Sequence, residues 1–400
     1  MTYKKNTDFI LFWLAGEKSG DTHAAQVMNK LNQSSTSFKH IGIGGPLMQE
    51  QGLKSIFPFE KFNVMGFVEV IKHLAFFSKV EQRIKAIFTG KDNSFNQRPD
   101  IVILVDYPGL NLRVAKIAYH ENIKVLYYIC PQFWAWKHHR VNKLAEYCDR
   151  VACILPFEKD LLDIHQISTS FVGHPITEEI DFKLTKDEFA ETYQLDTNKK
   201  WISFFPGSRE NEVKKLLPVF LKTIKILSKK YPDYEFLISK SNSISHNLFI
   251  NLFLNIEENE SLKNSTKLID SHNHELMKYS DFMIVKSGTT TIESAFIGTP
   301  FAITYIANQV SYMIAKKIIK IKFIGLPNII LNEEEKLSQP VIPELIQENV
   351  SPKNIISTIE HYLNNPDNYK EFKDKLSKIK NLLGNESASE NVKNLIFKLL

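Results

Sequence analysis

Short apolar runs bounded by turn residues alternate with stretches of helical period, and this alternation occurs twice along the chain. Alternation of this kind predicts right-handed βαβ units on a parallel sheet. We therefore predict an α/β protein of two Rossmann-like domains that face a central cleft at the carboxyl ends of both sheets, where such folds bind ligands. The expected strands are 9–15, 101–105, 124–129 and 150–155 in the first series, and 201–205, 234–239, 266–270, 282–285 and 300–305 in the second.

The length of 400 residues agrees with two domains, because one hydrophobic core rarely organises so many residues. Residues 176–200 are polar and charge-rich without a clear strand, which is typical of a connection between domains. We expect an N-terminal domain at 1–180 and a C-terminal domain at 181–350. Residues 351–400 are expected to form helices that pack back on the N-terminal domain or on a partner.

The composition argues against several classes of partner and cofactor. The formal net charge of +5 is small against 50 basic and 45 acidic residues, which disfavours nucleic acid as a partner. Cys130, Cys148 and Cys153 lack C-x-x-C spacing, so we expect buried thiols in a reducing, cytoplasmic compartment and no metal. Neither half contains G-x-G-x-x-G or a Walker loop, and we expect no cofactor.

The apolar run 9–15 follows Lys4 and Lys5 and superficially resembles a short signal peptide. It leads directly into a glycine-rich turn, so we interpret it as the first buried strand. No apolar segment reaches the ~18 residues that are needed to span a bilayer.

The strand expected at 201–205 stops at Pro206-Gly207, and a helix begins near Arg209. A helix N-terminus presents unpaired N–H groups and the positive end of the helix dipole, so it favours a phosphate. Arg209 adds a planar guanidinium that matches phosphate oxygens in pairs. We predict that Gly207, Ser208 and Arg209 bind an anion. The alternative is an ordinary helix start in which Ser208 is the cap and Arg209 is solvated.

A second helix start of this kind follows residues 282–285, at Ser287-Gly288-Thr289. Its hydroxyl groups are additional donors for an anion. Glu293 lies one turn further along, where it could accept hydrogen bonds from ribose hydroxyls. Alternatively, Glu293 is an acidic residue near a helix N-terminus that the helix dipole favours.

Asp106 follows the apolar run 101–105 and precedes Tyr107-Pro108-Gly109, which places a carboxylate at the carboxyl end of a buried strand. Such a position faces the expected cleft. Partial desolvation there raises the pKa of a carboxylate toward a value that suits a general base. We predict that Asp106 is a general base; the alternative is that it caps the following turn or helix.

A glycine-rich turn joins the first strand to the first helix, and glycine allows a tight bend or a close approach to a ligand. We predict that this turn contacts a sugar or an acceptor phosphate, although glycine-rich turns without a ligand are also common. Two tryptophans stand beside basic side chains after Pro131, where they could line an acceptor groove or fill the space between sheet and helix. The residues concerned are Gly16, Glu17, Ser19, Gly20, Asp21, Trp134 and Trp136.

The sequences of two segments predict contact with a membrane surface. Residues 62–88 have helical period but more Phe than one buried face needs, and residues 312–324 place lysines among Ile and Phe without an acidic residue. Basic amphipathic surfaces bind anionic bilayers by apolar insertion and by about 1 kcal/mol per lysine. Core packing with a solvated lysine face is the alternative for each segment. The predicted contact residues are Phe67, Phe76, Phe77, Lys316, Lys317 and Lys320.

Taken together, these segments resemble lipid-A-disaccharide synthase, the glycosyltransferase family that joins two acylated glucosamines in outer-membrane lipid assembly. Any one segment is weak evidence, whereas the ordered set, which covers most of the chain, is highly specific. The set comprises Ala15-Gly16-Glu17 with Ser19-Gly20-Asp21, Gly44-Gly45-Pro46 with Met48, residues 64–70 and 131–136, Leu155-Pro156-Phe157-Glu158, Val172-Gly173-His174-Pro175, Pro206-Gly207-Ser208-Arg209, Ser287-Gly288-Thr289 and Gly325-Leu326-Pro327-Asn328.

The resemblance implies a GT-B architecture and an inverting, metal-independent hexosyl transfer. The donor is then UDP-2,3-diacylglucosamine and the acceptor 2,3-diacylglucosamine 1-phosphate, and the products are lipid A disaccharide 1-phosphate and UDP. The N-terminal domain would face the acceptor and the membrane, and the C-terminal domain would bind the UDP-sugar. The resemblance also implies a cytoplasmic protein that associates peripherally with the inner membrane of a Gram-negative cell. Whether the chain forms a homodimer is left open.

Position by position, the resemblance makes Asp106 the base for the acceptor 6-hydroxyl and Arg209 an essential arginine near the leaving UDP. One departure is visible, because the family commonly has a second Asp three residues after the first, and this chain has Gly109 there. A single base is enough for an inverting displacement. The resemblance places Ser287, Gly288, Thr289, Glu293 and Asn328 in segments that hold UDP, and Gly16, Glu17, Ser19, Gly20, Asp21, Met65 and Trp136 in segments near the acceptor.

Two other functions stay open on sequence grounds. One is another GT-B UDP-sugar transferase that acts on a lipid-linked acceptor, and the other is a non-catalytic, membrane-associated protein that binds a nucleotide sugar. An NAD-dependent oxidoreductase is disfavoured, because no G-x-G-x-x-G opens either half.

Overall fold

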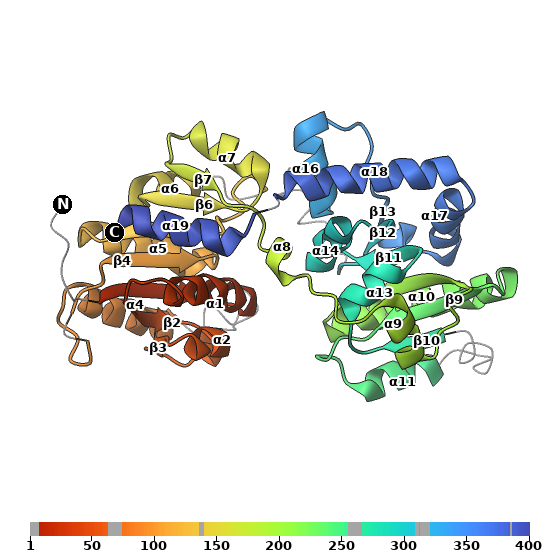
Figure 1. The fold of residues 1–400 in the computed structure, drawn as a ribbon, viewed down its shortest axis with the longest axis horizontal. Coiled ribbons are helices and arrows are strands. Elements are labelled where there is room, and N and C mark those ends of the chain that lie inside the picture. Colours follow the sequence, from red (N-terminus) through yellow and green to blue (C-terminus); the bar gives the residue numbers. More distant parts are fainter. Residues whose placement is uncertain are drawn as a thin grey trace. The chain divides into compact units, whose positions relative to one another are not determined.

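Figure 1 shows the computed structural model of the chain, which describes residues 8–62, 74–95, 97–135, 140–254, 266–308, 312, 321–384 and 386–400. The chain divides into two compact units. Unit 1 comprises Met1–Thr177 and Asn385–Leu400, and unit 2 comprises Glu178–Gly384. The break between the units lies close to the boundary expected at 180/181.

Unit 1 is built on a parallel sheet of seven strands in the order β3-β2-β1-β4-β5-β6-β7. The strand order reverses between β1 and β4, which makes this the topological switch point where open α/β sheets bind ligands. The predicted α/β class and its Rossmann-like topology are therefore confirmed for this unit. The strands are β1 (Phe9–Ala15), β2 (Phe38–Ile43), β3 (Lys54–Ser55), β4 (Ile101–Val105), β5 (Lys124–Tyr128), β6 (Arg150–Cys153) and β7 (Thr169–Phe171).

Helices cover both faces of the unit 1 sheet. Because successive strand residues point to opposite faces, Trp13 of β1 packs in the cluster with α1 and α19, whereas Phe12 packs in the cluster with α4, α5 and α6. In Figure 1 the C-terminal helix α19 lies beside α1, although the two are at opposite ends of the chain. The helices are α1 (Lys18–Asn32), α2 (Pro46–Glu50), η1 (Phe59–Phe62), α4 (Leu74–Phe88), α5 (Pro108–His120), α6 (Arg140–Tyr147), α7 (Pro156–Asp163) and α19 (Ala388–Leu399).

Unit 2 repeats this plan with a parallel sheet of six strands in the order β10-β9-β8-β11-β12-β13. Its switch point lies between β8 and β11. The strands are β8 (Lys200–Phe205), β9 (Tyr234–Ser239), β10 (Thr266–Ile269), β11 (Phe282–Lys286), β12 (Phe301–Tyr305) and β13 (Glu344–Ile346). The helices are α9 (Lys186–Tyr193), α10 (Glu210–Lys230), α11 (His246–Leu254), α13 (Asn273–Tyr279), α14 (Thr289–Ile297), α16 (Leu326–Glu335), η2 (Gln347–Asn349), α17 (Pro352–Leu363) and α18 (Pro366–Leu382). The short helix α8 (Ile176–Glu179) spans the boundary between the units.

Residues 351–400, which the sequence groups as one helical segment, are shared between the two units. Helix α17 packs on α10 and helix α18 on α14, so both belong to unit 2. Helix α19 packs on α1 in unit 1, where Val392 and Ile396 are fully buried. The segment is divided because α17 and α18 bury their apolar stripes in unit 2, whereas α19 buries its own in unit 1.

The predicted membrane contacts Phe76 and Phe77 belong to an aromatic cluster in the core of unit 1. Phe77 is only 6% exposed, and Phe76 packs at ring-centroid distances of 5.8 Å from Phe57 and 5.3 Å from Phe62. The Arg113 guanidinium lies over the Phe77 ring at 5.9 Å. For Phe77 the prediction is wrong, because the packing of α4 on the sheet buries the side chain.

Six other predicted site residues fall outside the described ranges, and for them the predictions stand as made. They are Met65, Phe67, Trp136, Lys316, Lys317 and Lys320. Within the described ranges, no helix is both long enough and apolar enough to cross a bilayer.

Candidate functional site

Asp106 lies directly after strand β4, at the switch point of the unit 1 sheet. Asp106 and Tyr107 both adopt the left-handed backbone conformation, with φ values of 47° and 45°. Non-glycine residues in this region are uncommon, and each costs on the order of 1–3 kcal/mol. Pro108 then begins helix α5, at a position where the missing N–H removes no hydrogen bond. The chain therefore leaves the sheet through a strained turn, and such turns cluster at functional sites.

The pKa of Asp106 is raised from its ordinary value of 3.8 to about 6, first by burial and then by the negative charge of Glu17. A backbone hydrogen bond at Tyr107 and the charges of His23 and Arg140 act in the opposite direction. A carboxylate with this pKa is largely ionised at neutral pH and is a stronger base than a solvated Asp. Its position and basicity suit proton abstraction.

The glycine-rich turn before α1 packs against the residue that follows Asp106. A Cβ added to Gly16 would lie 2.5 Å from the Tyr107 ring, so a larger residue would displace that ring. Tyr107 is held from its other end by a 3.1 Å hydrogen bond from its hydroxyl to the carbonyl of Phe62. Gly20 is buried, and its added Cβ would lie 3.3 Å from Ala15, so this glycine allows α1 to approach β1 closely.

The polar residues of this turn have different roles. Glu17 and Ser19 are exposed at the start of α1, and the charge of Glu17 reaches Asp106. Asp21 is only 2% exposed, and its carboxylate accepts hydrogen bonds from the backbone N–H groups of Leu47 at 3.2 Å and Met48 at 3.1 Å. These N–H groups belong to the first turn of α2. We therefore correct the assignment of Asp21 to the acceptor site: both of its carboxylate oxygens cap α2.

Glu158 is a second buried carboxylate of unit 1, and our reading of the sequence gave it no role. Its Oε1 accepts a hydrogen bond from Trp134 Nε1 at 3.1 Å, and its Oε2 accepts one from the Leu155 backbone N–H at 3.2 Å. Burial raises the pKa of Glu158 to about 7. Trp134 also packs edge-on against Phe157, with ring centroids 5.1 Å apart. Glu158 thus ties the segment after β5 to the start of α7, and Trp134 fills space between them.

Unit 2 contains a pocket of about 430 Å³ at the carboxyl ends of β8, β9 and β11. This is the end of the sheet where α/β folds bind ligands. The pocket brings together most of the residues predicted to hold a nucleotide, from two helix starts that are far apart in the sequence. These residues are Gly207, Ser208, Arg209, Gly288, Thr289 and Glu293.

The first helix start lies where the sequence predicts it. Gly207 has a φ of 109°, which favours glycine, so the chain turns tightly before α10. Arg209 is the N-cap residue of α10, and its side chain is 65% exposed. Ser208 is therefore not the cap, and its carbonyl accepts a 2.7 Å hydrogen bond from the Ser243 hydroxyl. The guanidinium of Arg209 is available to a ligand in the pocket.

Two charged residues of this pocket were not predicted. Lys286 Nζ lies 2.7 Å from Glu212 Oε1, and both side chains are 18% exposed. The same oxygen lies 3.9 Å from Arg209 Nη1. One carboxylate therefore holds two cations beside the pocket. The position of Lys286 could have been noticed in the sequence, because it ends strand β11 directly before the predicted glycine turn. Its pairing with Glu212 on α10 has no signal in the sequence.

The second helix start contributes Gly288, Thr289 and Glu293 to the pocket. Gly288 is the N-cap residue of α14, and Glu293 lies one turn further along. Burial raises the pKa of Glu293, while the charge of His274 acts against this shift. Ser287 is not among the lining residues, and its backbone N–H donates to the Thr304 carbonyl at 2.9 Å.

Asn328 is fully buried and does not line this pocket. Its Nδ2 donates to the Ile342 carbonyl and to Glu344 Oε1, both at 2.8 Å, and its Oδ1 accepts from the Ile342 N–H at 2.9 Å. These bonds occupy the amide and fix the start of α16 to the segment before β13. We therefore correct its assignment to direct UDP binding.

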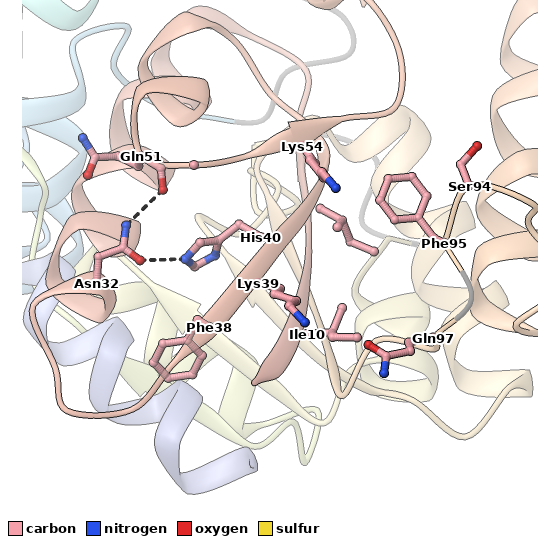
Figure 2. Close-up of a pocket in the computed structure, with 12 residues that line it drawn as sticks. Ile10, Asn32, Phe38, Lys39, His40, Gln51, Lys54, Ser94, Phe95 and Gln97 are labelled. Atoms are coloured by element: carbon pink, nitrogen blue, oxygen red, sulfur yellow. Dashed lines mark hydrogen bonds between the residues drawn. The ribbon is translucent and has the colours of Figure 1, made fainter. Parts of the chain in front are cut away.

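A further cavity of about 670 Å³ lies in unit 1 at the amino ends of β1 and β2 (Figure 2). Figure 2 shows Asn32 between His40 and Gln51, with Lys39 and Lys54 on the other side of the strand. Burial lowers the pKa of His40 to about 4, and the neutral ring accepts from Trp13 Nε1 at 2.9 Å. The cavity is at the end of the sheet opposite to Asp106, so we do not assign it to the reaction site.

In the described parts of the chain, no three His, Cys, Asp or Glu side chains are grouped so that they could hold a metal ion. The positive groups at the unit 2 pocket include Arg209, Lys286, which is paired with Glu212, and the two helix N-termini.

Comparison with known proteins identifies the family of this chain. The family model described as lipid-A-disaccharide synthetase matches residues 11–397. This chain belongs to the lipid-A-disaccharide synthase family. The synthase of Trichlorobacter lovleyi is 34% identical over 387 residues, which cover 97% of this chain and 96% of that protein. The synthase of Geobacter sulfurreducens is 31% identical, with 99% of this chain and 98% of that protein covered.

Solved structures share the fold at much lower identity. A UDP-GlcNAc 2-epimerase from Neisseria meningitidis, solved with UDP-GlcNAc bound, has a TM-score of 0.59 at 15% identity and covers 98% of this chain and 100% of its own. The calicheamicin glycosyltransferase CalG4 has a TM-score of 0.62 at 9% identity and covers 99% of both chains. The chain thus has the GT-B architecture. It is a hexosyltransferase of the family that forms the disaccharide of lipid A.

Proposed function

We propose that this synthase transfers the sugar of UDP-2,3-diacylglucosamine to the 6-hydroxyl of 2,3-diacylglucosamine 1-phosphate, with Asp106 as the general base. The observation that carries the proposal is the environment of Asp106. It is a partly buried carboxylate with a pKa of about 6, in a strained turn at the switch point of unit 1. Such a group can accept a proton from a sugar hydroxyl at neutral pH.

The reaction is a single displacement at the anomeric carbon of the donor. The acceptor O6 attacks this carbon, its proton passes to the Asp106 carboxylate, and the bond between the anomeric carbon and the UDP oxygen breaks. Attack from the face opposite to UDP inverts the anomeric configuration. One carboxylate is enough for this step, so Gly109 at the second acidic position of the family is compatible with activity.

The unit 2 pocket is the proposed site of the UDP group. Negative charge grows on the diphosphate as the glycosidic bond breaks, and preorganised positive groups stabilise that charge. Arg209 and Lys286 provide two cations there, and the N-termini of α10 and α14 provide N–H groups. We assign Glu293 to the donor as well, since it lines the same pocket. Ser287 is assigned to shaping the turn before α14.

We further propose that the synthase works at the cytoplasmic surface of the inner membrane, as a peripheral protein. Both substrates carry acyl chains, which partition into a bilayer. The apolar sequence around Phe67 and the lysines of 312–324 are suited to contact with such a surface. Flotation with anionic vesicles should carry the chain upward at low salt, and Lys316→Gln with Lys317→Gln should weaken this binding. Flotation that is indifferent to salt and to these substitutions would contradict the electrostatic part of the proposal.

Product analysis by mass spectrometry tests the proposed reaction. The wild-type synthase is incubated with the acylated acceptor and either UDP-2,3-diacylglucosamine or UDP-N-acetylglucosamine. We expect the tetra-acylated disaccharide 1-phosphate from the first donor and no product from the second. Turnover of only the non-acylated donor would instead identify another GT-B UDP-sugar transferase.

A matched pair of variants tests the roles of the two sites. Asp106→Asn should reduce turnover to a small residual rate and leave the dissociation constant of UDP within a few-fold of wild type. Arg209→Ala should weaken UDP binding and turnover together. Full turnover of Asp106→Asn would remove this residue from the mechanism.

A further inference from the structure

The carbonyl oxygen of Asp106 accepts two hydrogen bonds from buried side chains. Asn111 Nδ2 donates to it at 2.6 Å, and the hydroxyl of Tyr127 donates to it at 2.7 Å. Both side chains belong to residues that are fully buried. They come from different elements, the first turn of α5 and strand β5. Two independent donors therefore meet at the backbone of the proposed base.

Asn111 also joins the ends of two neighbouring strands. Its Nδ2 lies 3.2 Å from the carbonyl oxygen of Val105 and 3.4 Å from that of Leu14. Three carbonyl oxygens surround this nitrogen, so the reversed amide orientation would place oxygen against oxygen. Asn111 Oδ1 is buried and has no hydrogen-bond partner within the described ranges. Burying this oxygen without a partner is unfavourable, which indicates that the side chain is present for its donor group.

These hydrogen bonds act on a strained part of the backbone. Asp106 and Tyr107 are both in the left-handed region, and the Asp106 N–H still bonds to the Tyr128 carbonyl at 2.9 Å. The N–H of Asp106 therefore still bonds to the neighbouring strand, while its carbonyl is turned toward Asn111 and Tyr127. This backbone conformation sets the direction of the Cα–Cβ bond of Asp106, and the carboxylate projects from that bond.

We propose that Asn111 and Tyr127 are positioning residues, which hold the Asp106 carboxylate in its reactive direction by binding the carbonyl oxygen of the same residue. The proposal rests on the role of Asp106 as the base. Burial raises the pKa of the Tyr127 phenol well above its ordinary value, so the hydroxyl stays protonated and donates at every pH at which the synthase works. Neither side chain needs to touch a substrate.

Steady-state kinetics of Tyr127→Phe and Asn111→Ala test this inference on the full chain. Small displacements of a catalytic group can lower a rate by about 100-fold. We expect kcat to fall about 10-fold in Tyr127→Phe and about 100-fold in Asn111→Ala, while KM for both substrates stays within about three-fold. Tyr147→Phe is the matched control, since it removes a hydroxyl from the same hydrophobic cluster without contact to Asp106.

A double variant separates positioning from a purely structural role. If Tyr127 acts only through the carboxylate, Tyr127→Phe should not lower the residual rate of Asp106→Asn any further. An equal fractional loss in both backgrounds would overturn the proposal, and so would an unchanged kcat in folded Tyr127→Phe. Tyr127→Phe keeps the buried ring, so it tests the proposal even if Asn111→Ala fails to fold. Full activity of Asp106→Asn would be a different failure, namely that of the proposed base itself.

Discussion

The raised pKa of Asp106 predicts that the substitution Asp106→Asn stabilises the fold while it removes activity. A rise in pKa from 3.8 to about 6 means that the ionised side chain destabilises the folded state. At about 1.36 kcal/mol per pKa unit this amounts to about 3 kcal/mol. Asp106 is partly exposed, which reduces the value, and we expect a gain of about 1–3 kcal/mol.

Asparagine is suited to this position for two further reasons. It accommodates the left-handed conformation better than most residues, and Asp106 has a φ of 47°. Its Oδ1 can also accept the backbone hydrogen bond at Tyr107 that the carboxylate accepts. The substitution therefore removes the charge with little other change.

The sign of the pH dependence follows from the same pKa. Because the folded pKa is the higher one, the folded state binds more protons than the unfolded state between pH 3.8 and about 6. The contribution of Asp106 to stability therefore falls as pH rises through this window. The advantage of Asp106→Asn should be absent below about pH 4 and complete above about pH 6. In the wild type, kcat/KM should rise over the upper part of the same window, as the base loses its proton.

Differential scanning calorimetry at pH 8 and pH 4 measures this effect. For a unit of this size, about 1 kcal/mol corresponds to a change in Tm of about 2–4 °C. We expect a higher Tm for Asp106→Asn at pH 8 and no difference at pH 4. Asp163→Asn is the control, since this carboxylate is exposed and paired with Lys159. A lower Tm of Asp106→Asn at pH 8 would refute the argument that burial of the charge raises the pKa.

Three further predictions concern positions where the structure narrows the role of a residue. Gly109→Asp should fold and keep kcat within a few-fold of wild type, because an added Cβ there meets no atom within 4 Å. Steady-state kinetics of the variant measure this. Lys286→Met should weaken UDP binding about 10-fold in titration calorimetry, whereas Lys214→Met on the exposed face of α10 should not. Asn328→Ala should lower the free energy of unfolding by about 2–4 kcal/mol in urea titrations, since it leaves the N–H and carbonyl of Ile342 unpaired, with unchanged UDP affinity.

Local sequence patterns were sufficient to predict the ends of the strands and the character of the turns that follow them. Asp106 was expected at the carboxyl end of a strand, and Gly207, Arg209, Gly288 and Thr289 at two helix starts. The structure has each of them there. Periodicity and turn residues encode these features within about ten neighbouring positions. The parallel sheets follow from the same alternation of strand and helix.

The tertiary structure decided which of these residues are available to a ligand. Asp21 and Asn328 have the polarity of binding residues, but segments from elsewhere in the chain occupy their hydrogen-bonding groups. Phe77 is buried by packing that its own helix does not specify. Lys286 lines the unit 2 pocket and is paired with Glu212, which lies on another element.

The sequence by itself thus determined the class of fold, the positions of the two helix starts and the location of Asp106, the proposed base, at a strand end. Only the tertiary structure decided the basicity of Asp106, the contacts that hold its backbone and the division of the C-terminal helices between the units. The physical reason is that hydrophobic period and turn chemistry are local properties. Burial, pKa and hydrogen-bond partners depend instead on which distant segments pack together.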